Sequence, residues 1–156
     1  MTDVTTTPGN GEPPIDAYLC LALYQASRAV TGLYRQLLAG LGLTYPQYLV
    51  MRLLWQRGPL PVKDIATALQ LHYGTLSPLL KRLQAAGLIN RNRRSDDERS
   101  VEIVLTDAGT ALHDQATDIP TELSCATGLS DEDMATLRQS LAHLTASVTQ
   151  ATPSTD

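Results

Sequence analysis

The sequence predicts a mainly α fold with the layout of a winged helix-turn-helix, because two short helices joined by a tight turn are followed by a basic β-hairpin. Apolar residues recur at helical spacing through most of the chain. Residues 88–93 and 100–105 are the exception and are predicted as strands, with apolar residues alternating toward one face in the second. Long helices on either side of this lobe would supply a dimerisation region.

The composition favours one compact domain. The chain has 156 residues, of which 43% are hydrophobic and 18% charged. We expect the folded domain at 13–150, between disordered ends at 1–12 and 151–156 that are rich in Thr, Gly, Pro and Ser. No apolar run approaches the roughly 20 residues that span a bilayer. The first residues lack the features of a signal peptide, so we expect a cytoplasmic protein with reduced thiols.

The first two helices are predicted from prolines, glycines and apolar periodicity. Pro13 and Pro14 open a helix whose apolar stripe continues to Leu37, and two glycines then end it. Pro46 starts the next helix, which runs as far as Gly58.

The helix-turn-helix follows directly. Pro61 opens a helix over 62–69, and a second helix is expected from about 74 to 86, with Gly87 as its C-terminal stop. After the hairpin, Thr106 caps a helix that Pro120 is expected to break at about Ile119. Ser130 begins the last helix, whose apolar seam suits packing against another helix.

Charge is distributed unevenly along the chain. The net charge is −4, yet residues 73–94 contain five basic side chains and no acid, whereas residues 106–156 contain eight acids and one base, Arg138. A local basic face on an acidic protein still favours phosphate binding. The second helix of a helix-turn-helix enters the major groove, and arginine at a wing tip suits the minor groove. We expect Asp97 to orient Arg99 by an ion pair. The candidates for DNA contacts are Tyr73, Gly74, Thr75, Ser77, Lys81, Arg82, Arg91, Arg93, Arg94, Asp97 and Arg99.

Cys20 lies among tyrosines in a chain that has six Tyr and no Phe. Tyrosine hydroxyls can donate hydrogen bonds to a thiolate, and Tyr24 lies one helical turn from Cys20. Cys20 is expected in the second turn of its helix, where the helix dipole contributes little. Tyr34 lies 14 residues further along, about 21 Å at the helical rise, so it could serve the thiol only from a second subunit. The alternative is that Cys20 is a small buried hydrophobe and that the tyrosines, including Tyr48, are interface packing.

Two segments resemble the MarR family of winged-helix repressors: "LTYPQYLVMRLLW" and "GTLSPLLKRLQAAGLINRNRRSDDERSVEIVLTDAG". The preceding "LCLALYQASRAVTGLYRQLL" is similar to the branch that senses organic hydroperoxides, and the likeness covers about residues 15–148. It implies dimerisation helices at 13–40 and 106–150 around a DNA-binding lobe at 45–105. Relatives often carry Asp or Ser before the position of Gly74, whereas this chain has His72 and Tyr73. This difference affects which residue caps the N-terminus of the recognition helix.

The resemblance also implies a redox mechanism. Cys20 would be oxidised by organic hydroperoxides, with Tyr34 and Tyr45 supplied by the partner subunit, and operator DNA would then be released. Cys125, in a stretch that we expect to be a loop, resembles the second cysteine of the two-cysteine members, which implies a disulfide between subunits. The family needs no cofactor.

Two other functions remain open from the sequence. One is a MarR repressor relieved by a phenolic ligand, and the other is a thiol peroxidase with Cys20 peroxidatic and Cys125 resolving. A basic wing serves no purpose in such an enzyme, so we expect no enzyme activity. The three histidines, His72, His113 and His143, have no ligand spacing, and we expect no metal site.

Overall fold

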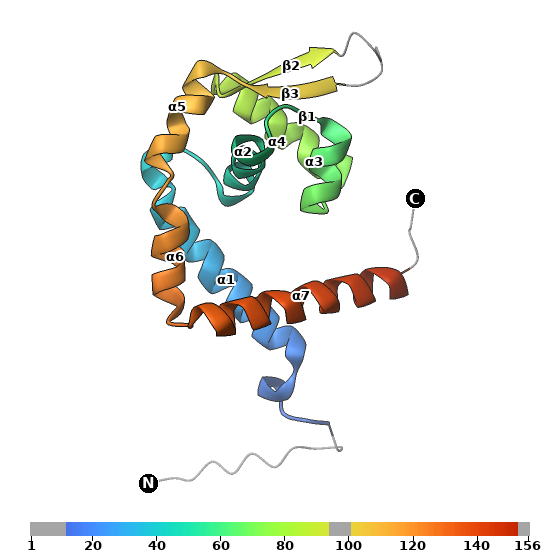
Figure 1. Ribbon diagram of the computed structural model, residues 1–156. Coiled ribbons are helices and arrows are strands. Elements are labelled where there is room, and N and C mark those ends of the chain that lie inside the picture. Colours follow the sequence, from blue (N-terminus) through green and yellow to red (C-terminus); the bar gives the residue numbers. More distant parts are fainter. Residues whose placement is uncertain (1–11, 94–100, 153–156) are drawn as a thin grey trace. The chain divides into compact units, whose positions relative to one another are not determined.

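The computed structural model describes residues 12–93 and 101–152 of the chain. The chain divides into two compact units, residues 1–117 and 118–156. Helices predominate, and one small antiparallel sheet lies in the first unit (Figure 1), which confirms the predicted fold class. None of the helices in the described ranges is long and apolar enough to cross a membrane.

The first long helix, α1, spans Leu19–Leu37 and begins later than its sequence predicts. Pro14 has an extended ψ of 149°, and a short 3-10 helix, η2, covers only Ile15–Ala17. Tyr18 is extended as well (ψ 127°) and its carbonyl accepts the Leu21 N–H at 3.2 Å, so it is the N-cap of α1. The prediction of one helix from Pro13 was therefore wrong, and Cys20 lies in the first turn of α1 instead of the second.

Helix α2 spans Tyr45–Arg57 and is fixed at its start by a reciprocal cap. The Thr44 N–H donates to Gln47 Oε1 at 2.8 Å, and the Thr44 hydroxyl donates to the same oxygen at 3.1 Å. These bonds satisfy the side-chain oxygen of Gln47, a residue that is buried. A 3-10 turn, η3 (Ala39–Leu41), precedes this cap, and Gly58 ends α2 at a φ of 76° that favours glycine.

The helix-turn-helix consists of α3 (Val62–Leu69) and α4 (Tyr73–Ala85), as the sequence predicts. Gln70 adopts a left-handed conformation (φ 51°) and ends α3, after which the Leu71 N–H donates to the Ala66 carbonyl at 3.0 Å. Leu76 and Leu80 on α4 are fully buried together with Ile65 of α3. Burial of these three side chains stabilises the two helices, each of which contacts α2.

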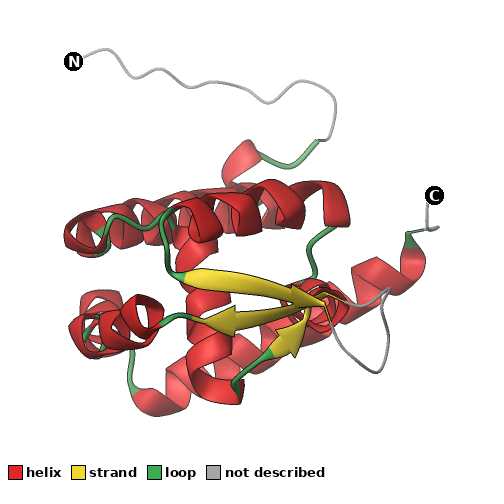
Figure 2. Cartoon of the chain, turned by 90° about the horizontal axis from the view of Figure 1, so that it is seen from above, coloured by secondary structure: helices red, strands yellow, loops and turns green. Residues whose placement is uncertain are grey.

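The hairpin strands β2 (Ile89–Arg93) and β3 (Val101–Leu105) pair in antiparallel register, Ile89 opposite Leu105 and Arg93 opposite Val101. A third strand, β1 (Leu60–Pro61), pairs with the other edge of β3, so the order is β1-β3-β2 (Figure 2). The sequence did not predict β1, because it is two residues long and contains a proline. It joins the wing to the start of α3.

Helix α5 (Asp107–Gln115) completes the described part of the first unit. Thr106 caps it as predicted: its hydroxyl oxygen accepts the Gly109 N–H at 3.0 Å and its hydroxyl donates to the Gly87 carbonyl at 2.6 Å. The Trp55 indole N–H donates to the Gly109 carbonyl at 2.9 Å, which ties α2 to α5.

The second unit contains α6 (Ile119–Thr127) and α7 (Asp131–Ala151). Helix α5 stops at Gln115, earlier than expected, and Pro120 lies in the first turn of α6, a position where its missing N–H costs nothing. Cys125 therefore lies on a helix, and the prediction of a loop there was wrong. Ser130 caps α7 as predicted, since its hydroxyl oxygen accepts the Asp133 N–H at 3.1 Å.

Candidate nucleic-acid interface and thiol site

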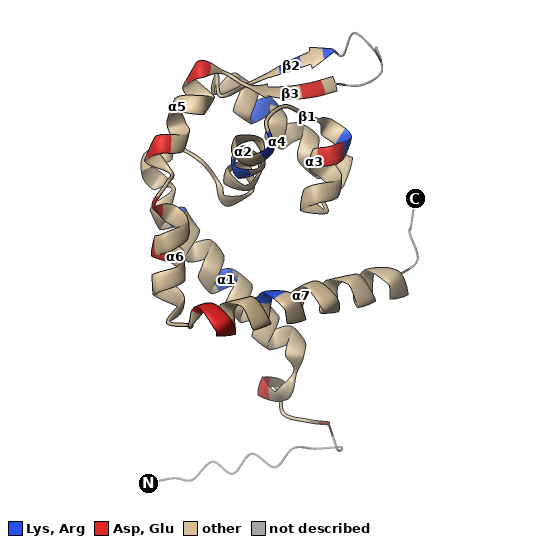
Figure 3. Ribbon diagram, viewed as in Figure 1, with Lys and Arg blue, Asp and Glu red and all other residues tan. Residues whose placement is uncertain are grey.

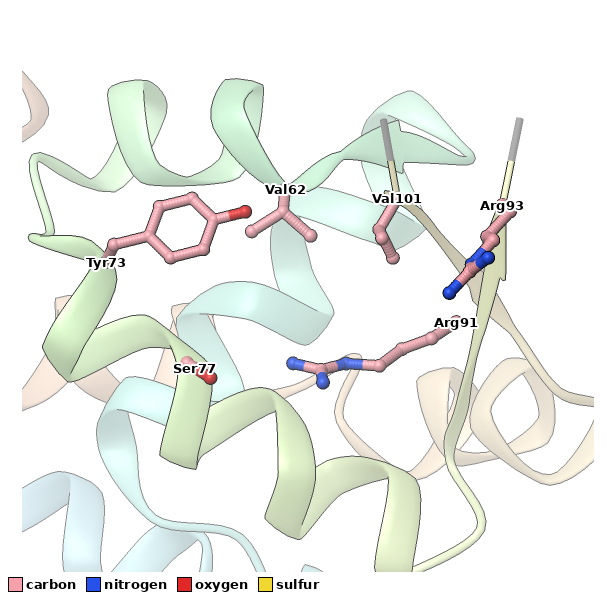
Figure 4. Close-up of a pocket in the computed structure, with 6 residues that line it drawn as sticks. All are labelled: Val62, Tyr73, Ser77, Arg91, Arg93 and Val101. Carbon is pink, nitrogen blue, oxygen red and sulfur yellow. The ribbon is translucent and has the colours of Figure 1, made fainter. Parts of the chain in front are cut away.

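A hollow of about 310 Å³ lies between the helix-turn-helix and the wing. Figure 4 shows the Arg91 and Arg93 guanidinium groups reaching into it from β2, with the Tyr73 and Ser77 hydroxyls on the side of α4. Its lining residues are Val62, Tyr73, Ser77, Arg91, Arg93 and Val101. Four of these were predicted as DNA contacts from the sequence, and the fold brings them together.

Strand register sets the direction of the two arginines. Arg91 pairs with Ile103 and Arg93 with Val101, so both arginines share the face of Ile89, which is fully buried. Along this face the strand passes from the buried Ile89 through the half-buried Arg91 to the exposed Arg93. Arg91 Nε is buried and has no hydrogen-bond partner within the part of the chain that the structure describes.

The first turns of α4 present polar side chains outward. Tyr73 is 62% exposed and Thr75 is exposed beside it, whereas Ser77 is half-buried at the hollow. His72 is the N-cap through its backbone only: its carbonyl accepts the Thr75 N–H at 3.0 Å, and its side chain makes no capping hydrogen bond. Gly74 lies in open space, with nothing within 4 Å of an added Cβ. The departure at His72 thus leaves the start of α4 intact.

Basic side chains lie on α4 and β2, as the sequence indicated, and on other elements as well. Figure 3 shows Lys and Arg on α1, α2, α3, α4 and β2 of the first unit, with acidic residues on α3, β3 and α5. In the second unit, Asp and Glu lie on α6 and at the start of α7. Lys81 and Arg82 are exposed on α4 but do not line the hollow. Arg94, Asp97 and Arg99 lie outside the described residues.

Three tyrosines form a buried cluster at the junction of α1 and α2. The Tyr34 ring stacks on Tyr45 with centroids 4.1 Å apart and lies 5.6 Å from Tyr48. Tyr34 and Tyr48 are buried, and Tyr45 is half-buried. Aromatic contacts continue from Tyr48 to Trp55 at 6.3 Å and from Trp55 to His113 at 5.0 Å.

Burial raises the pKa of all three tyrosine hydroxyls further above neutral pH. It raises the pKa of Tyr34 to about 12, with smaller contributions from Tyr45 and Tyr48 in the same direction and an opposing one from Arg52. Burial likewise raises the pKa of Tyr45 and of Tyr48. At neutral pH each hydroxyl therefore remains a hydrogen-bond donor.

Cys20 is exposed in the single chain, in the first turn of α1. Tyr24, one turn further, is 59% exposed, and its hydroxyl accepts a hydrogen bond from Arg28 Nη1 at 3.1 Å. The Arg28 guanidinium also lies over the Tyr24 ring, 5.6 Å from its centroid. Tyr24 makes no hydrogen bond to Cys20 among the described residues, and the sequence did not point to Arg28.

Within one chain, Cys20 and Tyr34 lie far apart along α1. Cys20 and Tyr34 lie on the same continuous helix, 14 residues apart, so about 21 Å of helical rise lies between them. Cys125 is exposed on α6, in the second unit, and both cysteines are free thiols.

Residues 43–101 match the family model described as "MarR family". The organic hydroperoxide resistance transcriptional regulator of Bacillus subtilis (strain 168) is 44% identical over 127 residues, which are 81% of this chain and 86% of that regulator. The chain belongs to the MarR family. It is a DNA-binding transcriptional regulator of the MarR type, and the resemblance seen in the sequence is confirmed.

Solved structures of MarR-type regulators agree with this assignment. One is "Structure of reduced AbfR bound to DNA", with a TM-score of 0.67, 35% identity and coverage of 81% of this chain and 91% of that one. Another is "Structure of Disulfide formed AbfR", with a TM-score of 0.59, 35% identity and coverage of 81% and 88%. AbfR is a protein of Staphylococcus epidermidis.

Sequence reasoning missed two residues of the hollow in this MarR-family lobe, Val62 and Val101. Val101 had a usable signal, because its alternation with Ile103 and Leu105 places it on the face of the arginines. Val62 had none, since its approach to the wing depends on the pairing of β1 with β3. In the described ranges no three His, Cys, Asp or Glu side chains are grouped so that they could hold a metal ion.

Proposed function

We propose that the protein is a homodimeric repressor that leaves its operator when an organic hydroperoxide oxidises Cys20. The observation that carries this proposal is the position of Cys20: an exposed thiol in the first turn of α1, where the positive end of the helix favours an anion. The likeness to a regulator of organic hydroperoxide resistance supports the same signal.

The oxidation step needs no cofactor or metal. The Cys20 thiolate attacks the terminal oxygen of the hydroperoxide, the O–O bond breaks, and the sulfur becomes a sulfenic acid. The alkoxide that leaves takes a proton from solvent and departs as the alcohol. The Cys125 thiol of the other subunit then attacks this sulfur, and water leaves as the disulfide forms. The existence of a disulfide form of AbfR supports this second step.

Tyrosines would assist the thiolate from two directions. Tyr24 lies on the same face of α1, one turn away. Tyr34 and Tyr45 would come from the partner subunit, since the length of α1 keeps Tyr34 far from Cys20 of its own chain. Both hydroxyls stay protonated as donors, which is the form that a thiolate requires.

Operator binding would use the elements described above together with the wing tip. We propose that Tyr73, Gly74, Thr75, Ser77 and Lys81 approach the major groove, and that Arg94 and Arg99 reach the minor groove with Asp97 orienting Arg99. Arg82, Arg91 and Arg93 would add to the basic face. A dimer formed through residues 13–40 and 106–150 would present two such lobes to an operator in the cytoplasm.

One experiment tests this function. Binding of wild-type protein and Cys20→Ser to a duplex selected by the wild-type protein is measured with and without cumene hydroperoxide. We expect the peroxide to release wild-type protein and to leave Cys20→Ser bound. Release of both proteins would place the sensor elsewhere, and release by a phenolic compound alone would favour ligand control.

A further inference from the structure

We propose that the hollow between α4 and β2 is a seat for one phosphate group of the DNA backbone, with Arg91 as its principal donor. This inference deepens the proposed DNA binding by assigning a particular contact to a particular side chain. It concerns a guanidinium that lines the hollow from β2, in the part of the hairpin that the structure describes.

The geometry of donors supports a phosphate. Arg91 and Arg93 reach the hollow from β2, and the hydroxyls of Tyr73 and Ser77 come from the first turns of α4 (Figure 4). Guanidinium groups and hydroxyls are the donors that bind phosphate oxygens. The volume of about 310 Å³ admits a phosphodiester group, and Val62 and Val101 form an apolar wall.

Within the described strands of the hairpin, the charge of the two arginines is not balanced by an acid on their own face. Glu102 on β3 pairs with Asn92 in the register, so its side chain leaves the sheet on the face opposite to Arg91. Arg91 Nε is buried without a hydrogen-bond partner in the described part of the chain, so the terminal nitrogens of the guanidinium are the donors that face the hollow. A phosphate in the hollow would accept hydrogen bonds from these terminal nitrogens and would neutralise two cations that share one face.

Such a contact would position the protein on DNA without distinguishing one base sequence from another. A phosphate bound between α4 and β2 contacts the recognition helix and the wing at once, which fixes the register of the lobe on the duplex. We therefore expect loss of Arg91 to weaken binding to the selected duplex and to an unrelated duplex by a similar factor.

Salt dependence is the first test. The dissociation constants of wild type, Arg91→Gln and Arg91→Lys are measured over a range of salt, with Arg138→Gln on α7 as the control for charge. Arg91→Gln should reduce the slope of log affinity against log salt by about one unit. It should also weaken binding on the order of tenfold. Arg91→Lys keeps the charge but lacks the planar guanidinium whose terminal nitrogens can bind two phosphate oxygens, so it should keep the slope and still lose affinity. Wild-type slope and affinity in both Arg91 variants, with native unfolding temperatures, would overturn the proposal.

A scan of the DNA with single uncharged methylphosphonates is the second test, and it uses wild-type protein. We expect one position in each half-site to weaken wild-type binding and to cost nothing further in Arg91→Gln. Equal losses for both proteins at every position would overturn the assignment. Inorganic phosphate, added at matched ionic strength, tests whether the hollow binds free phosphate instead. The hollow would bind free phosphate and not the DNA backbone if inorganic phosphate weakened DNA binding of wild type but not of Arg91→Gln, and no methylphosphonate weakened binding. Failure of wild-type protein to select any duplex would instead contradict the proposed function.

Discussion

At the scale of single residues, Tyr18 determines where Cys20, the proposed sensor, lies on α1. Its extended backbone ends the 3-10 turn and starts α1 one residue later, so Cys20 lies beside the unsatisfied N–H groups of the first turn. Arg28 already pairs with the Tyr24 hydroxyl, which orients that ring on the same face. A thiolate at Cys20 would therefore be stabilised in its own chain by the N-terminus of α1. The hydroxyls of Tyr34 and Tyr45 would have to come from the partner subunit.

Replacement of Tyr45 by Phe should slow the oxidation of Cys20 without changing operator affinity. The substitution keeps the ring that stacks on Tyr34 and removes one donor for the partner's thiolate. We expect a loss in rate on the order of tenfold, the size of one hydrogen bond to a charged group. Sulfenic acid formation, followed by mass spectrometry under limiting cumene hydroperoxide, measures it. Tyr73→Phe in the DNA-binding lobe is the control, and equal rates for both variants would mean that another group assists the thiol.

Tyr34 should also make the fold sensitive to alkali. Burial raises the pKa of Tyr34 to about 12 from 10.0, so above pH 10 the unfolded chain loses a proton that the folded chain keeps. The free energy of unfolding should thus be constant below pH 10 with respect to this group and fall as pH rises toward 12, by about 2 kcal/mol. Tyr34→Phe should flatten this fall, and Tyr24→Phe, at an exposed hydroxyl, should not. Chemical denaturation across this pH range measures both.

At the scale of elements, Gly109 allows α5 to approach the turn between α4 and β2. A Cβ at this position would overlap the Leu88 carbonyl oxygen, a backbone atom that cannot rotate away. The same segment accepts the Trp55 N–H and is capped by Thr106, whose hydroxyl donates to Gly87. One glycine therefore lets α5 contact both α2 and the base of the wing.

Gly109→Ala should destabilise the protein by about 2 kcal/mol or more, because relief of the overlap requires a backbone shift. Gly32→Ala is the matched control within a helix, since nothing lies within 4 Å of its added Cβ and its φ is not positive. There alanine should stabilise α1 by up to about 1 kcal/mol through helix propensity. Denaturant midpoints measure both changes, and equal midpoints would show that α5 shifts without cost.

The elements that sequence predicted are those whose signals are local. The apolar spacing in α3 and α4, the alternation in β3 and the cap at Thr106 each act within one segment, and each was found. Other features depend on choices that the sequence leaves open. Pro120 is compatible with the end of one helix or the first turn of another, and β1 exists only because β3 lies beside it.

The candidate site also has features that the sequence predicts and features that only the fold reveals. Residue type and position in the chain indicated Tyr73, Ser77, Arg91 and Arg93, yet only the fold of the hairpin onto α4 shows that they share one hollow. The helical rise could exclude contact between Cys20 and Tyr34 in one chain, because that distance follows from a single helix. The break at Tyr18, which places Cys20 in the first turn of α1, was not predicted, because no residue type or spacing marks it.

At the scale of the whole molecule, the position of Cys125 on a helix constrains how the proposed disulfide could release DNA. A disulfide requires Cα atoms about 4.4–6.8 Å apart, and a loop could supply that approach by itself. Helix α6 holds Cys125 in a regular turn between the first-turn Pro120 and Gly128, so its thiol moves with the helix. Bond formation should therefore displace α6 or the partner's α1 as a body and rotate the two DNA-binding lobes away from their half-site spacing.

Oxidised protein should accordingly form a covalent dimer that depends on both cysteines. We expect cumene hydroperoxide to convert wild-type protein to a dimer on non-reducing gels and dithiothreitol to restore the monomer, because both thiols are exposed and a sulfenic acid condenses readily with a thiol. Cys20→Ser and Cys125→Ser should each abolish the dimer. An equimolar mixture of the two variants, exchanged into heterodimers, should regain one disulfide between Cys125 of one variant and Cys20 of the other, which a bond within one chain could not produce. If oxidised wild-type protein left DNA while Cys125 remained fully open to alkylation, the second cysteine would have no part in release and Cys20 alone would be the sensor.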